Sequence, residues 1–275
     1  RAIQATYPPG STFKMVTALA GLENGFSRSS RFSPCHGSYF YGGRPFKCWK
    51  AGGHGSLDLP GAIANSCNVY FYQLGRAVGL EKWQKTGELL GIGARTGIDI
   101  DDEVSGRLPT VEYYKTTDRY YSPGMMLNLA IGQGENDVTI IQLAQYVGII
   151  ASEGIKAAPH LDKDMAVKPE RIEGISRESF RVVKEGMLRV VTEGTARSAG
   201  VPGHMVAGKT GTAQNPHGAD HKLFVGFAPY DEPTIAIACV AENAGDQIPS
   251  RAVTVARRFL EEYFKDYPDG TAAKQ

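Results

Sequence analysis

The stretch MVAGKTGTAQ, residues 205 to 214, is the first of three short β-rich runs near the end of the chain. The other two, residues 222 to 230 and 234 to 243, are similar in composition and are bounded by turn residues. Three such runs joined by short connections predict an antiparallel meander. The amphipathic pattern of residues 250 to 265 predicts that a helix follows this sheet.

Upstream of these strands, the apolar residues recur mostly at helical spacing. Two stretches, residues 28 to 60 and 91 to 124, are instead rich in turn-forming residues and lack periodicity, so we expect ordered loops there. The acidic run Asp101-Asp102-Glu103 in the second loop is typical of a solvated surface. Helices are predicted over residues 11–24, 68–90, 137–153 and 177–193.

The composition and the order of these elements predict one α+β domain over residues 1–275. A chain of 275 residues with 42% hydrophobic content can bury a large core. Residues 11–200 are expected to form a mainly helical part with long loops, and residues 201–275 the sheet and the C-terminal helix. Lys and Arg number 30 against 29 Asp and Glu, which offers no electrostatic argument for a nucleic-acid partner. No stretch approaches the ~20 apolar residues that span a bilayer.

Three short motifs carry the residue types that acyl transfer needs. Ser11-Thr12-Phe13-Lys14 places a hydroxyl and an amine on one face of a predicted helix, because residues three apart are neighbours there. Ser66-Cys67-Asn68 supplies a second hydroxyl and an amide, and Lys209-Thr210-Gly211-Thr212 a cation followed by small hydroxylated residues. Each motif is weak alone, but their order, spacing and predicted local structure make the set specific.

This ordered set resembles the transpeptidase domain of class B penicillin-binding proteins, most of all the elongation-type penicillin-binding protein 2. The resemblance implies the fold shared with serine β-lactamases, an antiparallel sheet flanked by helices plus a mainly helical subdomain. It also implies that a membrane helix, a pedestal and a first strand precede this portion. We therefore expect a soluble portion of a protein at the periplasmic face of the inner membrane. Further stretches that carry the resemblance are Tyr7-Pro8-Pro9-Gly10, Gly52-Gly53-His54-Gly55, Gly132-Gln133-Gly134 and Val225-Gly226-Phe227-Ala228-Pro229.

The first two motifs are expected to hold the nucleophile and the groups that move protons. A serine hydroxyl is a weak nucleophile, so Ser11 needs a base within reach, and we predict that Lys14 is this base. Burial and the charge of Lys209 would both lower the pKa of Lys14 and favour its neutral form. Ser66 can relay a proton to the leaving amine, and Asn68 can hold the side chain of Lys14 and the substrate amide.

The third motif is expected to bind the end of the substrate. Lys209, with the hydroxyls of Thr210 and Thr212, suits a terminal carboxylate, and Gly211 lets the substrate backbone lie against the strand edge. By resemblance, the backbone N–H groups of Ser11 and Thr212 form the oxyanion hole.

The resemblance implies a peptidoglycan stem peptide ending in D-Ala-D-Ala as the substrate, and covalent inhibition by β-lactam antibiotics. It also implies that the full-length protein works in cell-shape maintenance beside a membrane glycan polymerase and an elongation-complex scaffold. Three alternatives use the same fold. A D,D-carboxypeptidase differs only in its acceptor, a β-lactamase needs a deacylation base that the sequence does not reveal, and a β-lactam-sensing receptor domain lacks the amide of Asn68.

A second site is predicted from the cysteines. Cys35, Cys48, His54 and Cys67 together make a complete tetrahedral zinc set, and closed four-ligand sites are structural. A structural Zn²⁺ would order the Gly-rich loop and, through Cys67, the second motif.

Two alternatives to this ligand set stay open. A Cys35–Cys48 disulfide is compatible with an oxidising compartment, and His36 could replace a cysteine ligand. Cys239, in an apolar predicted strand, is expected to be a small buried hydrophobe.

Overall fold

The computed structural model describes residues 1–117, 119–248, 250–268 and 270, and a three-stranded antiparallel sheet lies at its centre. Strands β5 (Ala207–Ala213), β6 (His221–Ala228) and β7 (Ile235–Ala241) follow one another in chain order. The meander predicted from sequence is therefore confirmed. Its register pairs the third motif with β6, so that Lys209 faces Val225 and Thr212 faces Lys222.

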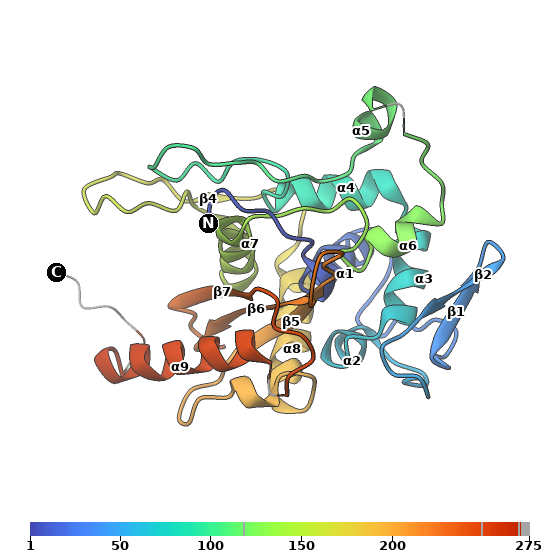
Figure 1. Ribbon diagram of the computed structural model, residues 1–275. Helices are drawn as coiled ribbons and strands as arrows, with labels where there is room; N and C mark the ends of the chain where they lie inside the picture. Colours follow the sequence, from blue (N-terminus) through green and yellow to red (C-terminus); the bar gives the residue numbers. More distant parts are fainter. Residues whose placement is uncertain (118, 249, 269, 271–275) are drawn as a thin grey trace.

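Helices cover both faces of this sheet (Figure 1). Helix α9 (Arg251–Asp266) packs on one face, and α7 (Ile140–Ala151) and α8 (Arg177–Thr192) pack on the other. All three coincide with helices predicted from sequence, within three residues at each end. The central strand β6 has buried apolar residues on both faces, Phe224 on one and Val225 and Phe227 on the other, because helices cover both faces.

The mainly helical part surrounds α1 (Lys14–Leu22), which is buried along almost its whole length. The predicted helix over residues 68–90 is in fact two, because Gly79 adopts φ = 80° between them. The bounds of the other helical elements in this part are η1 Gly10–Phe13, α2 Leu59–Ala64, α3 Asn68–Val78, α4 Leu80–Leu89, α5 Val111–Thr116, α6 Met125–Leu129 and η2 Arg197–Ala199.

Two of the predicted loops contain regular structure. Residues 28–60 include an antiparallel hairpin of β1 (Ser38–Tyr41) and β2 (Arg44–Lys47) besides the start of α2, and residues 91–124 include α5. A small second hairpin, β3 (Ile155–Lys156) and β4 (Glu170–Arg171), follows α7. The prediction of a solvated acidic run was wrong for Glu103, which is buried and accepts hydrogen bonds from Thr96 and from the backbone N–H of Gly97.

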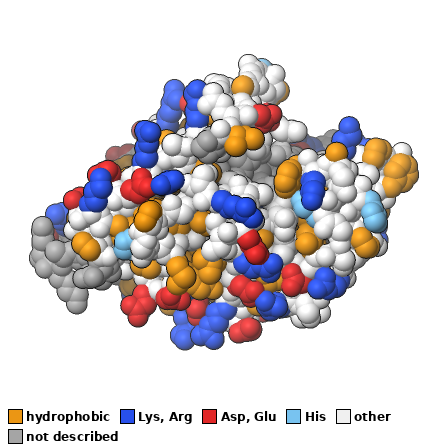
Figure 2. All heavy atoms as spheres, turned by 90° about the horizontal axis from the view of Figure 1, so that it is seen from below, with side chains coloured by type: hydrophobic (Ala, Val, Ile, Leu, Met, Phe, Trp, Pro, Cys, Tyr) orange, Lys and Arg blue, Asp and Glu red, His pale blue; other side chains and the backbone are white. Residues whose placement is uncertain are grey.

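The surface of the molecule mixes charges of both signs. Figure 2, which views the molecule from below Figure 1, shows acidic and basic side chains interspersed, with apolar side chains between them. Within the described ranges, no helix is long and apolar enough to cross a membrane.

Candidate active site and metal centre

Three backbone segments meet where the first motif begins. Gly10 has φ = 53°, and a Cβ placed there would lie 2.3 Å from the carbonyl oxygen of Thr212. Gly132 has φ = 73°, and a Cβ placed there would lie 2.1 Å from the carbonyl oxygen of Gly10. The N–H of Gly10 in turn donates to the carbonyl oxygen of Gly132. Only glycine tolerates both the conformation and the contact. The structure thus brings the backbone before Ser11 against the backbone of Thr212.

Lys14 connects the first motif to the second. Ser11 lies in the 3-10 turn η1 and Lys14 is the first residue of α1. The Nζ of Lys14 donates to Ser66 O at 2.8 Å, to Ser66 Oγ at 3.1 Å and to Asn68 Oδ1 at 2.6 Å. Burial of this amine lowers the pKa of Lys14 to about 7, against opposing charges on Cys48 and Cys67. Lys14 can therefore exist in its neutral form at physiological pH.

The second motif is positioned by the two helices on either side of it. Ser66 follows α2 and is buried with φ = 51°, a left-handed conformation that costs a non-glycine residue about 1–3 kcal/mol and persists only where its surroundings enforce it. Cys67 is the N-cap of α3, and Asn68 is its first residue. Both serine and amide therefore project from a sharp turn between two anchored helices.

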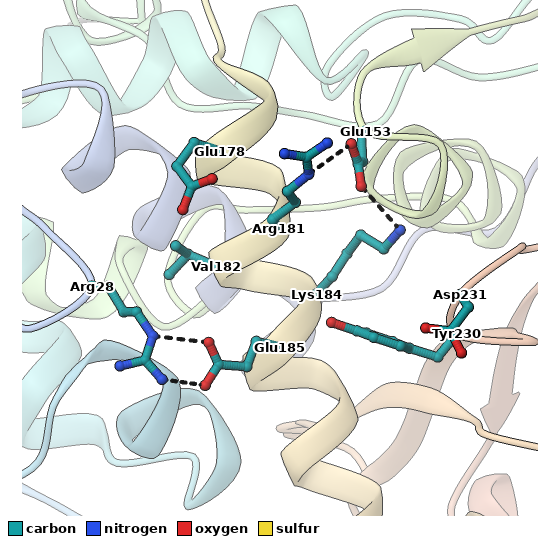
Figure 3. Close-up of a pocket in the computed structure, with 9 residues that line it drawn as sticks. All are labelled: Arg28, Glu153, Glu178, Arg181, Val182, Lys184, Glu185, Tyr230 and Asp231. Carbon is teal, nitrogen blue, oxygen red and sulfur yellow. Dashed lines mark hydrogen bonds and ion pairs between the residues drawn. The ribbon is translucent and has the colours of Figure 1, made fainter.

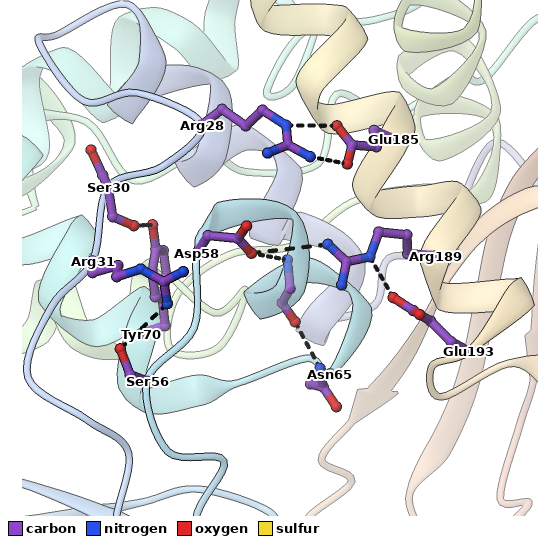
Figure 4. A network of polar contacts seen from close by, with 11 residues as sticks. Arg28, Ser30, Arg31, Ser56, Asp58, Asn65, Tyr70, Glu185, Arg189 and Glu193 are labelled. Atoms are coloured by element: carbon purple, nitrogen blue, oxygen red, sulfur yellow. Dashed lines mark hydrogen bonds and ion pairs between the residues drawn. The ribbon is translucent and has the colours of Figure 1, made fainter.

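A polar network fixes α2 to α8, as Figure 4 shows. The Asp58 side chain caps α2 by accepting from the N–H of Gly61 at 2.9 Å, and it lies 3.9 Å from Arg189 of α8. Arg28 forms a two-pronged ion pair with Glu185 of the same helix. This network holds the short helix that leads into Ser66.

The third motif lies on β5, opposite the first. Lys209 is fully buried, and its pKa is well below the usual value because of burial and the nearby charge of Lys14. Of the two causes expected to lower the pKa of Lys14, burial is confirmed, whereas the repulsion between the two amines lowers the pKa of Lys209 instead. A Cβ on Gly211 would lie 2.8 Å from Thr12 Cγ2, so glycine lets β5 approach η1 closely. Thr210 Oγ1 is 3.1 Å from Thr195 Oγ1.

One contact ties the third motif to the segment Gly132-Gln133-Gly134. Gln133 Nε2 donates to the carbonyl oxygen of Thr212 at 3.0 Å, so this segment lies against β5 as well as Gly10. The family resemblance implies that this segment lines the site, without a chemical role, and its contact with β5 agrees with that expectation. The structure therefore brings the eight predicted catalytic and substrate-binding residues of the three motifs to one place.

The four predicted metal ligands form one cluster. The ligand atoms of Cys35, Cys48, His54 and Cys67 all lie within 4.8 Å of one another. His54 Nδ1 is 3.5 Å from Cys48 Sγ and 3.8 Å from Cys35 Sγ. Zinc bonds of about 2.3 Å to sulfur and about 2.0 Å to nitrogen, at a tetrahedral angle, separate such atoms by roughly 3.5 Å. This cluster of three cysteines and one histidine could hold a metal ion.

The chemistry of these side chains also suits a metal. The hydrogen bond between Cys67 and Cys48 lowers the pKa of Cys48 and raises that of Cys67, so Cys48 is the thiol of this pair that ionises first to the thiolate form that binds metals. All four cysteines are free, so the Cys35–Cys48 disulfide is absent from the structure. His54, not His36, completes the cluster. Cys239 is only partly buried on β7, so the expectation that it is a buried hydrophobe was too strong.

Known proteins resemble this chain over most of its length. Peptidoglycan D,D-transpeptidase MrdA of Acinetobacter baumannii is 34% identical in an alignment of length 271 that covers 88% of this chain and 40% of that protein. Penicillin-binding protein PBP2 of Helicobacter pylori has a TM-score of 0.88 and 29% identity, covering 99% of this chain and 51% of the other. PBP2 of Pseudomonas aeruginosa, solved with WCK 5153, has a TM-score of 0.83 and 32% identity, covering 97% and 60%.

These similarities establish the protein family of this chain. This chain spans less than two thirds of the length of these relatives. Residues 1–261 match the penicillin binding protein transpeptidase domain. That match includes the three motifs, the sheet and most of α9. A chain that is covered almost end to end in both sequence and fold belongs to the family of penicillin-binding protein transpeptidase domains.

Proposed function

We propose that this chain is the catalytic domain of a peptidoglycan D,D-transpeptidase, which cross-links stem peptides through an acyl-enzyme on Ser11. The observation that carries this proposal is the environment of Lys14. Its amine is buried, bonded to Ser66 and Asn68, and half neutral near pH 7, one helical turn from Ser11. A serine beside such an amine has the base that nucleophilic attack requires.

In the proposed reaction, neutral Lys14 accepts the proton of Ser11 as Oγ attacks the carbonyl carbon of the penultimate D-Ala. The backbone N–H groups of Ser11 and Thr212 stabilise the resulting oxyanion. The proton passes through Ser66 to the leaving D-Ala amine as the peptide bond breaks. An amine of a neighbouring stem peptide then attacks the ester and restores Ser11.

Substrate binding is proposed for β5. A peptide lying along this strand would place its terminal carboxylate near the hydroxyls of Thr210 and Thr212. Lys209, buried on the same strand, adds positive potential there in its protonated form, and this potential favours a carboxylate.

We further propose an elongation role for the full-length protein, at the periplasmic face of the inner membrane. Its partners would be a membrane glycan polymerase and an elongation-complex scaffold. PBP2 of Helicobacter pylori has been solved in a complex with MreC, and this chain is 30% identical to that protein. This similarity supports a related assembly for the full-length protein.

For the cysteine cluster, we propose a structural Zn²⁺ bound by Cys35, Cys48, His54 and Cys67. Three sulfur ligands and one imidazole favour zinc over harder cations. A metal in this place would tie β2, the following loop and the second motif together. It would supply rigidity only, and no step of the proposed reaction would pass through it.

Removing this metal is expected to lower both stability and acylation rate. Prolonged chelation should release one zinc per chain and lower the melting temperature, by about 2–4 °C for each kcal/mol lost in a chain of this size. Acylation by benzylpenicillin should slow because Cys67 separates Ser66 from Asn68. The measurements are metal content, thermal unfolding and acylation rate of the same samples.

Two cysteine variants provide the controls for this prediction. Cys35→Ser should lose the metal, whereas Cys239→Ser, outside the cluster, should keep it. A metal-free sample that acylates at the unchanged rate would show that the metal does not support the second motif.

The proposed function is tested by following the intact mass of the protein after it is mixed with benzylpenicillin. A one-to-one adduct that persists for hours is expected. An adduct that disappears while antibiotic is consumed would identify a β-lactamase, and the absence of an adduct would contradict the proposal. If the adduct forms, a D-Ala-D-Ala peptide with and without an acceptor amine distinguishes a transpeptidase from a D,D-carboxypeptidase.

A further inference from the structure

A second lysine lies beside the third motif, on the neighbouring strand. Lys222 of β6 is directly opposite Thr212 of β5 in the antiparallel register. Side chains of such a pair project from the same face of the sheet. The Nζ of Lys222 is 3.3 Å from Thr212 Oγ1, the hydroxyl for which we predicted carboxylate binding. Nothing in the sequence pattern singles out Lys222.

The charge of Lys222 is poorly compensated for its burial. Its side chain is 11% exposed, and its ion-pair partner Asp246, at 2.7 Å, is 95% exposed. Such an exposed carboxylate is well hydrated and contributes little, whereas a buried cation costs free energy unless it is paired. Within the described ranges, the ammonium has two acceptors, Thr212 and Asp246, for its three hydrogens. An anion bound at Thr212 could therefore accept the third hydrogen bond of the Lys222 ammonium and interact with its charge.

The same contact orients the hydroxyl of Thr212. An ammonium can only donate, so Thr212 Oγ1 is the acceptor in its bond with Lys222. The hydroxyl hydrogen is then free to point toward a ligand. A carboxylate at this position would accept from Thr212 and interact with the charge of Lys222.

We propose that Lys222 is a specificity-determining residue that recognises, together with Thr212, the terminal carboxylate of the donor peptide and the matching carboxylate of β-lactams. This proposal rests on the proposed transpeptidase function. Lys222 supplies to this subsite a cation that lies outside the three motifs.

The test compares acylation by benzylpenicillin with acylation by its methyl ester, which lacks the negative charge. Lys222→Met is expected to slow acylation by benzylpenicillin about 10- to 100-fold, as befits a lost hydrogen bond to a charged group. The rate of acylation by the ester should change less than about threefold. The ratio of the benzylpenicillin rate to the ester rate therefore falls. Lys222→Arg keeps the charge and should restore most of this ratio.

Two variants separate recognition from structural effects. Asp246→Asn breaks the ion pair but keeps the cation, so the ratio should not fall. Lys184 of α8 is a matched control, because it is buried and lies 3.6 Å from Glu153 in a separate cavity, shown in Figure 3. Lys184→Met should leave the ratio unchanged even if the protein becomes less stable.

The outcomes distinguish this inference from the function on which it rests. If wild-type protein is acylated but Lys222→Met leaves the ratio unchanged, the role of Lys222 is refuted and the transpeptidase proposal stands. An equal fall of the ratio in Asp246→Asn would mean that the ion pair acts only structurally, which also overturns the inference. If neither compound acylates wild-type protein, both proposals fail.

Discussion

Replacing Ser11 with Ala is expected to abolish covalent labelling by benzylpenicillin. The adduct is an ester to a side-chain hydroxyl, and Ala has none. Ser11 lies at the meeting point of Gly10, Gly132 and Thr212, where the proposed oxyanion hole would face the reacting carbonyl. Intact-protein mass after hours of incubation should show the wild-type adduct and only the unmodified mass for Ser11→Ala. No other substitution proposed for this chain has a larger expected effect.

The control must exclude unfolding and a different nucleophile. Ser11 is partly exposed, so its replacement should change the free energy of unfolding by less than about 0.5 kcal/mol, and thermal unfolding checks this. Ser66→Ala keeps the proposed nucleophile and should slow labelling without abolishing it. If Ser66→Ala loses the adduct while Ser11→Ala keeps it, the two serines have been assigned the wrong roles.

The sheet and the long helices could be predicted from the sequence because their signals are local. The runs on β5, β6 and β7 carry β-rich composition between turn residues, and α9 carries a clear amphipathic pattern. The hairpin of β1 and β2 also had a local signal, since Gly42-Gly43 forms a two-residue turn with φ of 56° and 79°. The glycines and prolines of residues 28–60 favour a loop, so the prediction from composition was wrong for this hairpin.

The arrangement of the site was only partly predictable. The order of the three motifs predicted the catalytic and substrate-binding residues. The spacing of the cysteines and of His54 predicted the metal-binding cluster. The contacts among Gly10, Gly132 and Thr212 depend on tertiary packing between segments more than 70 residues apart, as does the bond from Gln133 to Thr212. Glu103 illustrates the same limit, since its burial follows from donors supplied by the turn at Thr96.

Acylation by benzylpenicillin is expected to depend on pH through Lys14, and Lys14→Arg should remove most of the rate. With the pKa of Lys14 lowered to about 7 by burial, the amine is neutral above pH 7 and protonated below it. The base is lost as pH falls, so the wild-type rate should drop about tenfold per unit below pH 7 and level off above it. Arginine stays protonated throughout, so Lys14→Arg should lose about 100- to 10,000-fold.

The hydrogen bonds of Lys14 explain why this titration is productive. A neutral amine has two hydrogens and one lone pair, so it can still donate to Ser66 O and Asn68 Oδ1 while the lone pair accepts a proton. Lys209 is also buried, and its pKa is lowered partly by Lys14. The dependence of the wild-type rate on pH therefore reflects the coupled titration of both lysines. Lys184→Arg, the same exchange at a buried lysine of α8, should keep the wild-type profile. A wild-type rate that is constant from pH 5.5 to 8.5, or a Lys14→Arg variant that acylates normally, would exclude Lys14 as the base, because neither result is compatible with proton transfer to this amine.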